Sequence, residues 1–245
     1  MFLPLQWAAF PGVHEHQQGA IPSPPFVMIA NVPCIELRPS GVTISEAASR
    51  PLVLFLHGNS SDLLRNWRKC RELANRTGFR VVCPEYRGYG VYPGPSKPEL
   101  IVADVRRVLR ASMGPHHRAH VVGYSIGAAV ACEVAGRESD LVASLTLAAP
   151  FRSLRAMVQQ TTKSAALAKA LTPSGTPFDS AAWMRQLPNR MPVLVVHGSR
   201  DALIPYSQGF SLASEHPGSI YILQVGRTHT SVDFGTIYSH LLSLR

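Results

Sequence analysis

The chain has 245 residues, of which 46% are hydrophobic and 16% are charged. This length fits a single α/β domain, and so many apolar residues can fill a core, which excludes an intrinsically disordered chain. The formal net charge of +9 comes without dense runs of basic residues, so we expect no nucleic-acid partner. The apolar stretches are too short for a transmembrane helix, and the N-terminus lacks the basic residues of a signal peptide. We expect a cytoplasmic protein whose basic charge leaves contact with a membrane surface open.

The first 50 residues are rich in Pro, Gly and Ser and predict a loop-rich lead-in, with a loop at Gln17–Pro25 and leading edge strands at Phe26–Val32 and Cys34–Arg38. From Pro51 onward, short aliphatic runs alternate with longer helical patterns. The aliphatic runs predict strands that are buried on both faces of a sheet. The predicted strands are Leu52–Leu56, Arg80–Cys83, Ala119–Val122, Leu145–Leu147, Val193–Val196 and Ile220–Val225. The predicted helices are Leu63–Asn75, Glu99–Ser112, Ile126–Ala135, Leu154–Leu171, Ser207–Glu215 and Val232–Leu244.

This alternation predicts an α/β fold, with a doubly wound and mostly parallel sheet, right-handed crossovers and helices on both faces. We place the lead-in at residues 1–50 and the α/β domain at residues 51–245. About 45 residues separate Leu147 from Val193, which is more than one crossover helix needs. Residues 151–191 therefore predict either a small cap over the carboxyl ends of the strands, where ligands bind in such sheets, or a plain surface excursion.

One G-x-S-x-G motif stands between a predicted strand and a predicted helix, as Gly123-Tyr124-Ser125-Ile126-Gly127. In that context the turn strains the serine backbone and presents Oγ at the tip of the sheet, beside a helix N-terminus that stabilises negative charge. We expect Ser125 to be a nucleophile and the amide of Ile126 to be one oxyanion donor. Tyr124 is a candidate substrate contact. The alternative is a glycine-rich turn without chemistry.

The first core strand ends in His57-Gly58-Asn59-Ser60. At this place in such a sheet, a backbone N–H turns towards the nucleophile and supplies the second oxyanion donor. We assign that donor to Asn59, with Ser60 as the second choice. We interpret His57 as structural, because it precedes Ser125 in the chain and lies in the turn at the strand end.

Two later strands are each followed by a polar loop. Asp201 follows the strand at Val193–Val196, and His229 follows the strand at Ile220–Val225. The chain order Ser125, Asp201, His229 is the order expected for a Ser-Asp-His triad on such a sheet. The serine hydroxyl needs His229 to take its proton, and Asp201 holds the imidazole in the right tautomer. This chemistry needs neither a metal nor an organic cofactor.

Other residues compete for the last two roles. Asp179 or Asp233 can supply the acid, and His240 can supply the base, although it lies within a predicted helix. We interpret His197, which also stands at a strand end, as structural.

Together these motifs resemble those of the α/β-hydrolase superfamily, and more narrowly the branch that includes depalmitoylating acyl-protein thioesterases. The matching pieces, within about Pro51 to the C-terminus, are Leu56–Leu63, Glu85–Gly90, Gly123–Gly127 and Val196–Asp201. The resemblance implies a serine hydrolase that cleaves a small-molecule or protein-linked acyl ester or thioester through an acyl-enzyme. The stretch Glu85–Gly90 is interpreted as scaffold. The alternatives are a binding or scaffold protein without turnover, and a peptidase or lyase on the same fold.

Two departures from that branch bear on membrane anchoring and on the substrate. The branch carries a cysteine-rich, lipidated N-terminus, whereas Cys34 is the one cysteine in the first 50 residues here. The loop before the catalytic histidine is usually small and glycine-rich, whereas here it carries Arg227. That charge predicts Arg227 as a substrate contact with a bias towards acidic substrates. The short cap predicts an open site for small or medium acyl groups.

Overall fold

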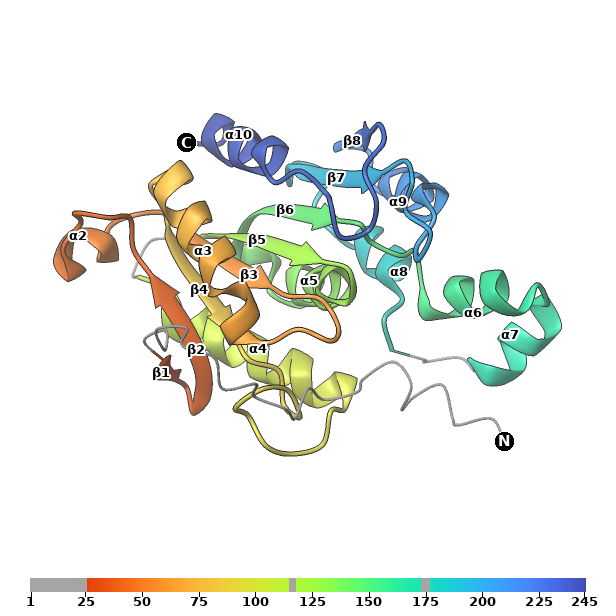
Figure 1. Ribbon diagram of the computed structural model, residues 1–245, viewed down its shortest axis with the longest axis horizontal. Helices are drawn as coiled ribbons and strands as arrows, with labels where there is room; N and C mark the ends of the chain where they lie inside the picture. Colours follow the sequence, from red (N-terminus) through yellow and green to blue (C-terminus); the bar gives the residue numbers. More distant parts are fainter. Residues whose placement is uncertain (1–25, 115–117, 173–176) are drawn as a thin grey trace.

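The computed structural model of this protein describes residues 26–114, 118–172 and 177–245. Residues 1–25, and with them the predicted loop at Gln17–Pro25, lie outside this range. Eight strands of the described residues form one sheet in the spatial order β1-β2-β4-β3-β5-β6-β7-β8 (Figure 1). They are β1 (Phe26–Ile29), β2 (Val32–Leu37), β3 (Leu52–Leu56), β4 (Arg80–Pro84), β5 (Ala119–Tyr124), β6 (Val142–Ala148), β7 (Val193–Gly198) and β8 (Ser219–Gln224).

The six strands from β3 to β8 pair in parallel, whereas the β1–β2 and β2–β4 pairs are antiparallel. All six predicted core strands are present, and β3 has the predicted bounds. The two leading strands form a hairpin whose turn residues, Ala30 and Asn31, have φ values of 50° and 63°. Because β2 pairs with β4, the two strands within residues 26–37 belong to the same sheet as the rest of the domain.

Helices cover both faces of this sheet. They are α2 (Ile44–Ala48), α3 (Leu63–Thr77), α4 (Pro98–Ser112), α5 (Ile126–Arg137), α6 (Leu154–Thr162), α7 (Ala165–Leu171), α8 (Ser180–Met184), α9 (Tyr206–Ala213) and α10 (Gly235–Ser243), with a 3-10 turn at η1 (Ser139–Leu141). α3 and α10 pack on one face, and α4 and α5 pack on the other (Figure 1). Neighbouring strand residues such as Leu54 and Phe55 are fully buried in these two different layers. The predicted doubly wound α/β fold is therefore confirmed.

The helix predicted as one element over Leu154–Leu171 is wrong, because it breaks into α6 and α7. Lys163 adopts φ 55°, a left-handed conformation that ends α6. The Ser164 side chain then accepts from the amide of Leu167 at 3.1 Å and starts α7. The sequence pattern did not predict α2, α8 or η1, because elements of three to five residues are too short to show a helical period.

The carboxyl ends of the parallel strands share one edge of the sheet, and the loops at this edge carry the predicted site residues. α6 and α7 follow β6 and extend from this edge (Figure 1). Gln208 on α9 anchors them, because it accepts from the Arg152 amide at 3.1 Å and donates to Gln160 at 3.0 Å. Whether residues 151–191 act as a cap stays a prediction. None of the helices in the described ranges combines the length and apolarity that a bilayer span requires.

Candidate active site

Ser125 stands at the turn that joins β5 to α5. Its backbone has φ 56° and ψ −119°, a left-handed conformation that a β-carbon disfavours. The Ser125 amide donates to the carbonyl of Ala148 on β6 at 2.9 Å, which holds this strained turn in place. Because α5 begins at the next residue, the serine lies at a helix N-terminus, where negative charge is stabilised. This is the strained strand-to-helix turn that the motif predicts.

The glycines of the motif let α5 approach the end of β3. A β-carbon on Gly127 would overlap the carbonyl oxygens of Leu56 and His57. A β-carbon on Gly123 would overlap the backbone of Gly127 and Ala128. A larger residue at position 127 would therefore push α5 away from the end of β3, and one at position 123 would push α5 away from β5.

Ser125, His229 and Asp201 form one continuous line of hydrogen bonds. Nε2 of His229 lies 3.0 Å from Oγ of Ser125, and Nδ1 of the same ring lies 2.7 Å from Oδ2 of Asp201. The short Nδ1 contact fits a ring that carries its proton on Nδ1 and donates it to the carboxylate. Nε2 is then left to accept from the serine hydroxyl. The three residues lie in the loops after β7 and β8 and in the turn after β5, and the fold brings them together.

Asp201 is buried, and both of its carboxylate oxygens have partners. Oδ1 accepts from the amides of Leu203 at 3.0 Å and Ile204 at 2.8 Å, while Oδ2 faces both His229 and His197. Burial by itself raises the pKa of the Asp201 carboxyl. Hydrogen bonds with the two histidines and the Ile204 amide outweigh burial and bring this pKa well below its ordinary range. Asp201 is therefore ionised at neutral pH and can orient the ring of His229.

The loops that carry Asp201 and His229 touch through their backbones. A β-carbon on Gly198, the last residue of β7, would overlap the carbonyl oxygen of Arg227. The amide of Arg200 donates to that same oxygen at 2.8 Å. This close approach of the two loops sets the spacing between the carboxylate and the imidazole, and both Arg200 and Arg227 are exposed.

Tyr124 supports the loop of His229. Its hydroxyl donates to the His229 carbonyl at 2.8 Å, and its ring centroid lies 5.4 Å from that of the imidazole. The ring also packs against Phe234 at 6.4 Å. These contacts fix where the imidazole enters the site. Arg227, the other candidate substrate contact, stands two residues before His229 with its side chain exposed.

The loop after β3 lies close to the serine. A β-carbon on Gly58 would lie 3.5 Å from Cβ of Ser125. Within the described ranges, the amides of Asn59 and Ser60 donate to no backbone carbonyl. The Ile126 amide is the first of α5 and has no acceptor within its own helix. These are the backbone donors that a substrate oxygen near the serine can meet.

A buried carboxylate, Glu85, holds this loop from the end of β4. Its Oε1 lies 3.1 Å from Nε2 of His57, and the ring of Tyr86 stacks on that imidazole at 4.1 Å. The hydroxyl of Tyr89 donates to Oδ1 of Asn59 at 2.8 Å. The predicted scaffold stretch thus fixes the predicted oxyanion loop. Sequence reasoning missed Glu85 as a partner of His57, although both follow predicted strands that are consecutive in the chain and that pair in the structure.

The alternative candidates for the acid and the base lie outside the hydrogen-bond line of Ser125. Asp179 caps α8, and Asp233 accepts from the amide that starts α10. His240 lies on α10, and burial lowers its pKa. No hydrogen bond links any of the three to Ser125 in the part of the chain that the structure describes. The same part of the chain holds no group of three or more His, Cys, Asp and Glu side chains that could bind a metal ion.

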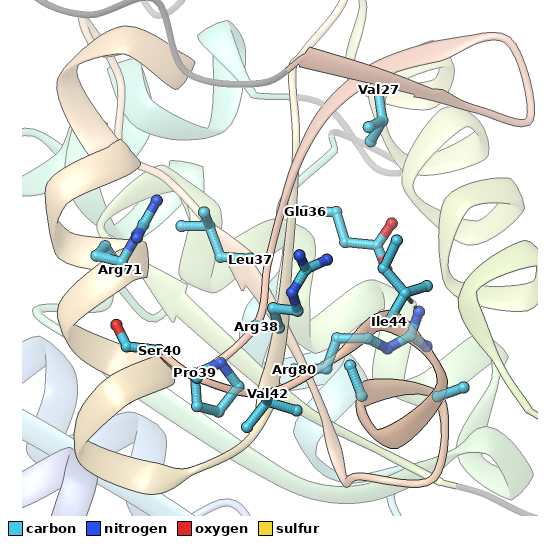
Figure 2. A pocket seen from close by; sticks show the side chains of 13 residues that line it. Val27, Glu36, Leu37, Arg38, Pro39, Ser40, Val42, Ile44, Arg71 and Arg80 are labelled. Carbon is cyan, nitrogen blue, oxygen red and sulfur yellow. Dashed lines mark hydrogen bonds and ion pairs between the residues drawn. The ribbon is translucent and has the colours of Figure 1, made fainter.

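A cavity of about 810 Å³ lies away from this site, between β2, α2 and α3 (Figure 2). Arg38 and Arg80 both line it, and Arg80 forms an ion pair with Glu36 at 2.7 Å. Because Arg80 begins β4, this cavity lies at the amino ends of the parallel strands, at the opposite edge from Ser125. None of the predicted site residues lines this cavity, so we do not assign it to the candidate active site.

The architecture and the order of these residues along the chain match a known family. The sequence model of the family described as alpha/beta hydrolase fold matches residues 51–185, which is more than half of the chain. The chain belongs to the α/β-hydrolase fold family. This α/β hydrolase is 28% identical over 193 residues to the alpha/beta hydrolase domain-containing protein aho-3 of Caenorhabditis elegans. It is 27% identical over 198 residues to the alpha/beta hydrolase domain-containing protein 17C of Homo sapiens.

These two matches cover 76% and 78% of the chain but only 54% and 56% of the relatives, so this α/β hydrolase spans a little over half of their length. Among solved structures it is similar to Est1E from Butyrivibrio proteoclasticus with bound ferulic acid. The TM-score is 0.67 at 14% identity, with 89% of this chain and 96% of that chain covered. The structural likeness concerns the fold. The resemblance predicted from the motifs is confirmed, and the family supports a hydrolase.

Proposed function

We propose that this α/β hydrolase is a serine hydrolase that cleaves carboxylic ester or thioester bonds through an acyl-enzyme. The observation that carries the proposal is the unbroken hydrogen-bond line from Oγ of Ser125 through both ring nitrogens of His229 to Asp201. A serine in a strained turn at a helix N-terminus adds support, because nucleophiles of this fold are held in that way.

In the first step, Oγ of Ser125 attacks the acyl carbon while Nε2 of His229 takes the hydroxyl proton. A carbon–oxygen bond forms, and the carbonyl electron pair moves to the oxygen. The amides of Ile126 and Asn59, with Ser60 as the second choice, donate to this oxyanion. The tetrahedral intermediate then collapses, the bond to the leaving alcohol or thiol breaks, and His229 returns the proton to the leaving group.

In the second step, water attacks the acyl-serine carbon and loses its proton to Nε2 of His229. Collapse of the second intermediate releases the carboxylic acid, and the proton returns to Ser125. Asp201 stays ionised throughout and stabilises the imidazolium that forms in each step. Tyr124 positions His229 through the carbonyl hydrogen bond, and we assign it this role ahead of a substrate contact.

The substrate class follows from the resemblance to the depalmitoylating branch, so acyl thioesters of proteins and small acyl esters are both substrates to test. The net charge of +9 supports peripheral contact with an anionic membrane surface on the cytoplasmic side. Arg227 is exposed and stands two residues before His229, and we assign it to substrate contact.

Labelling of the purified protein with a fluorophosphonate tests the proposal, with wild type beside Ser125→Ala. We expect labelling of wild type alone, together with a loss of ~10³-fold or more in kcat for Ser125→Ala. A folded wild type that is not labelled would count for a binding or scaffold protein. A panel of acyl esters, acyl thioesters and peptide amides then separates an esterase or thioesterase from a peptidase.

A further inference from the structure

A groove of about 500 Å³ opens beside His229, between α3 and the loop that leads into α10. One wall is a face of α3, on which four residues at helical spacing line the groove: Arg65, Arg68, Lys69 and Glu72. The other wall contains Arg227 and residues 230–235. The groove therefore begins two residues from the candidate base, and its charged lining is mostly basic.

Basic side chains outnumber acidic ones in the lining of this groove, four to two. None of its three arginines or its lysine has a carboxylate within ion-pair distance among the residues that the structure describes. Arg65 donates to a neutral acceptor, the carbonyl of Ser60, at 2.9 Å. Two acids also line the groove: Glu72, which lies 3.9 Å from Arg76 and whose charge also acts on Lys69, and Asp233, which accepts from a backbone amide. The remaining excess of positive charge in the groove attracts an anion.

Lys69 is the most enclosed of these basic residues. Its ammonium lies 4.3 Å from the ring centroid of Phe234 and 5.0 Å from that of Tyr124. Burial lowers the pKa of Lys69, because desolvation disfavours its charged form. The ring of Tyr124 in turn packs on His229, so the ammonium stands one aromatic ring away from the candidate base. A bound anion would give this ammonium the oxygen acceptors that two rings do not offer.

We propose that this anion groove binds a phosphate carried by the leaving group of the acyl substrate. The inference rests on the proposed function, because it needs the acyl carbon at Ser125. His229 delivers its proton to the departing oxygen or sulfur, and Arg227 and Thr230, which flank His229 in the chain, both line the groove, so a leaving group that extends from the base can reach it. Arginine pairs with phosphate through two parallel hydrogen bonds, and phosphate carries more charge than one carboxylate. The substrate class is an acyl ester or thioester with a phosphate-bearing leaving group.

Two matched substrates test this proposal: a 1-acylglycerol 3-phosphate and the 1-acylglycerol with the same acyl chain. Wild type should show a higher kcat/KM for the phosphorylated ester. Lys69→Met removes the charge and keeps the length, so the ratio of the two kcat/KM values should fall about tenfold, as expected for a lost charged hydrogen bond. Lys69→Arg keeps the charge and should retain most of the ratio. Arg190→Gln is the matched control, since Arg190 is exposed and precedes β7 at the opposite edge of the sheet.

A competition experiment with inorganic phosphate tests the groove with a ligand that has no acyl chain. Inorganic phosphate should compete with the phosphorylated ester in wild type and about tenfold more weakly in Lys69→Met. A wild type without preference for the phosphorylated ester overturns the proposal, and so does a ratio that Lys69→Met leaves unchanged or that Arg190→Gln lowers equally.

Fluorophosphonate labelling of the same samples distinguishes a failure of the groove proposal from a failure of the proposed function. A labelled enzyme without a phosphate preference overturns the groove and leaves the serine hydrolase intact. An unlabelled wild type overturns the proposed function. In that case the leaving-group proposal falls with the proposed function, and thermal stabilisation by inorganic phosphate tests the anion site alone: stabilisation that Lys69→Met abolishes supports an anion site in the groove, and stabilisation that Lys69→Met leaves unchanged overturns it.

Discussion

The buried ring of His197 places Nε2 at 3.1 Å from Oδ2 of Asp201. The same Nε2 lies 2.8 Å from the carbonyl oxygen of Ile204, and a carbonyl can only accept. Nε2 of His197 therefore carries a proton, which Asp201 and Ile204 share. Oδ2 of Asp201 thus has two histidine neighbours, of which His229 faces the serine and His197 holds the carboxylate.

His197 is accordingly a positioning residue, and its replacement should affect turnover through Asp201. We expect His197→Leu to lower kcat about tenfold with little change in KM, because the carboxylate loses a donor of about 1–2 kcal/mol. The pKa of Asp201 should then rise, so as the pH is lowered the activity of the variant should begin to fall at a higher pH than that of wild type. His197→Gln keeps an N–H near the position of Nε2 and should recover part of kcat. Equal effects of both variants would assign His197 to packing alone.

Gly127 is expected to be intolerant of any side chain. Gly127→Ala would drive a β-carbon into the carbonyl oxygens of Leu56 and His57, which belong to the backbone and cannot rotate away. We expect a loss of about 2 kcal/mol or more in the free energy of unfolding, together with a loss of activity. Urea unfolding measures the first and ester hydrolysis the second.

Gly41 is the control for that substitution, because nothing lies within 4 Å of its β-carbon position. The φ of Gly41 is 80°, so Gly41→Ala should lower the free energy of unfolding only by the strain of a left-handed residue, about 1–2 kcal/mol. Its activity should be retained. A Gly127→Ala variant as stable and active as Gly41→Ala would contradict the close packing of α5 on the end of β3.

The hydroxyl of Tyr89 is expected to matter for turnover more than for folding. Tyr89→Phe removes the 2.8 Å hydrogen bond to Asn59 and leaves the buried ring in place. The free energy of unfolding should fall by about 1 kcal/mol. The value of kcat should fall several-fold, because the Asn59 side chain is no longer fixed and its backbone N–H is no longer held towards the oxyanion. Steady-state kinetics beside thermal unfolding checks both. If kcat stays at the wild-type value, Asn59 is not the oxyanion donor.

His120 should make the fold sensitive to mild acid. Burial lowers its pKa to about 4, with a smaller contribution from His240, and its Nδ1 lies 2.8 Å from Oγ of Ser144. The unfolded chain takes up this proton near pH 6.5 and the folded chain near pH 4, so this contribution to stability is complete above pH 6.5. It is lost as the pH falls towards 4, by about 3 kcal/mol.

Urea unfolding between pH 4 and pH 7 measures this loss for wild type and for His120→Asn, which keeps a group near Nδ1 but does not titrate. The stability of the variant should vary less with pH. Parallel curves for the two proteins would show that His120 does not control the acid response.

Local patterns were sufficient for the core of the fold and for the candidate residues. The run Leu52–Leu56 predicted β3 with its bounds, because a strand buried on both faces leaves an uninterrupted aliphatic stretch. The motif around Ser125 predicted its strained turn, because the spacing of its glycines between a strand and a helix is a local signal, although the bond to Ala148 that holds the turn is not. The helix break at Lys163 escaped prediction, although residues 159–164 are all polar and Ser164 is of a helix-capping type.

What the sequence by itself determined was the six core strands, the five helices α3, α4, α5, α9 and α10, the family, and the order of Ser125, Asp201 and His229 along the chain, since each depends on local spacing. Only the tertiary structure decided that Glu85 meets His57, that His197 shares Oδ2 of Asp201 and that Lys69 lies over Tyr124. Apart from the His197 contact, these join residues far apart in the chain, and even His197 meets Asp201 through the turn after β7. Such contacts follow from strand order and loop closure, and hydrophobic periodicity carries no information about which loops meet.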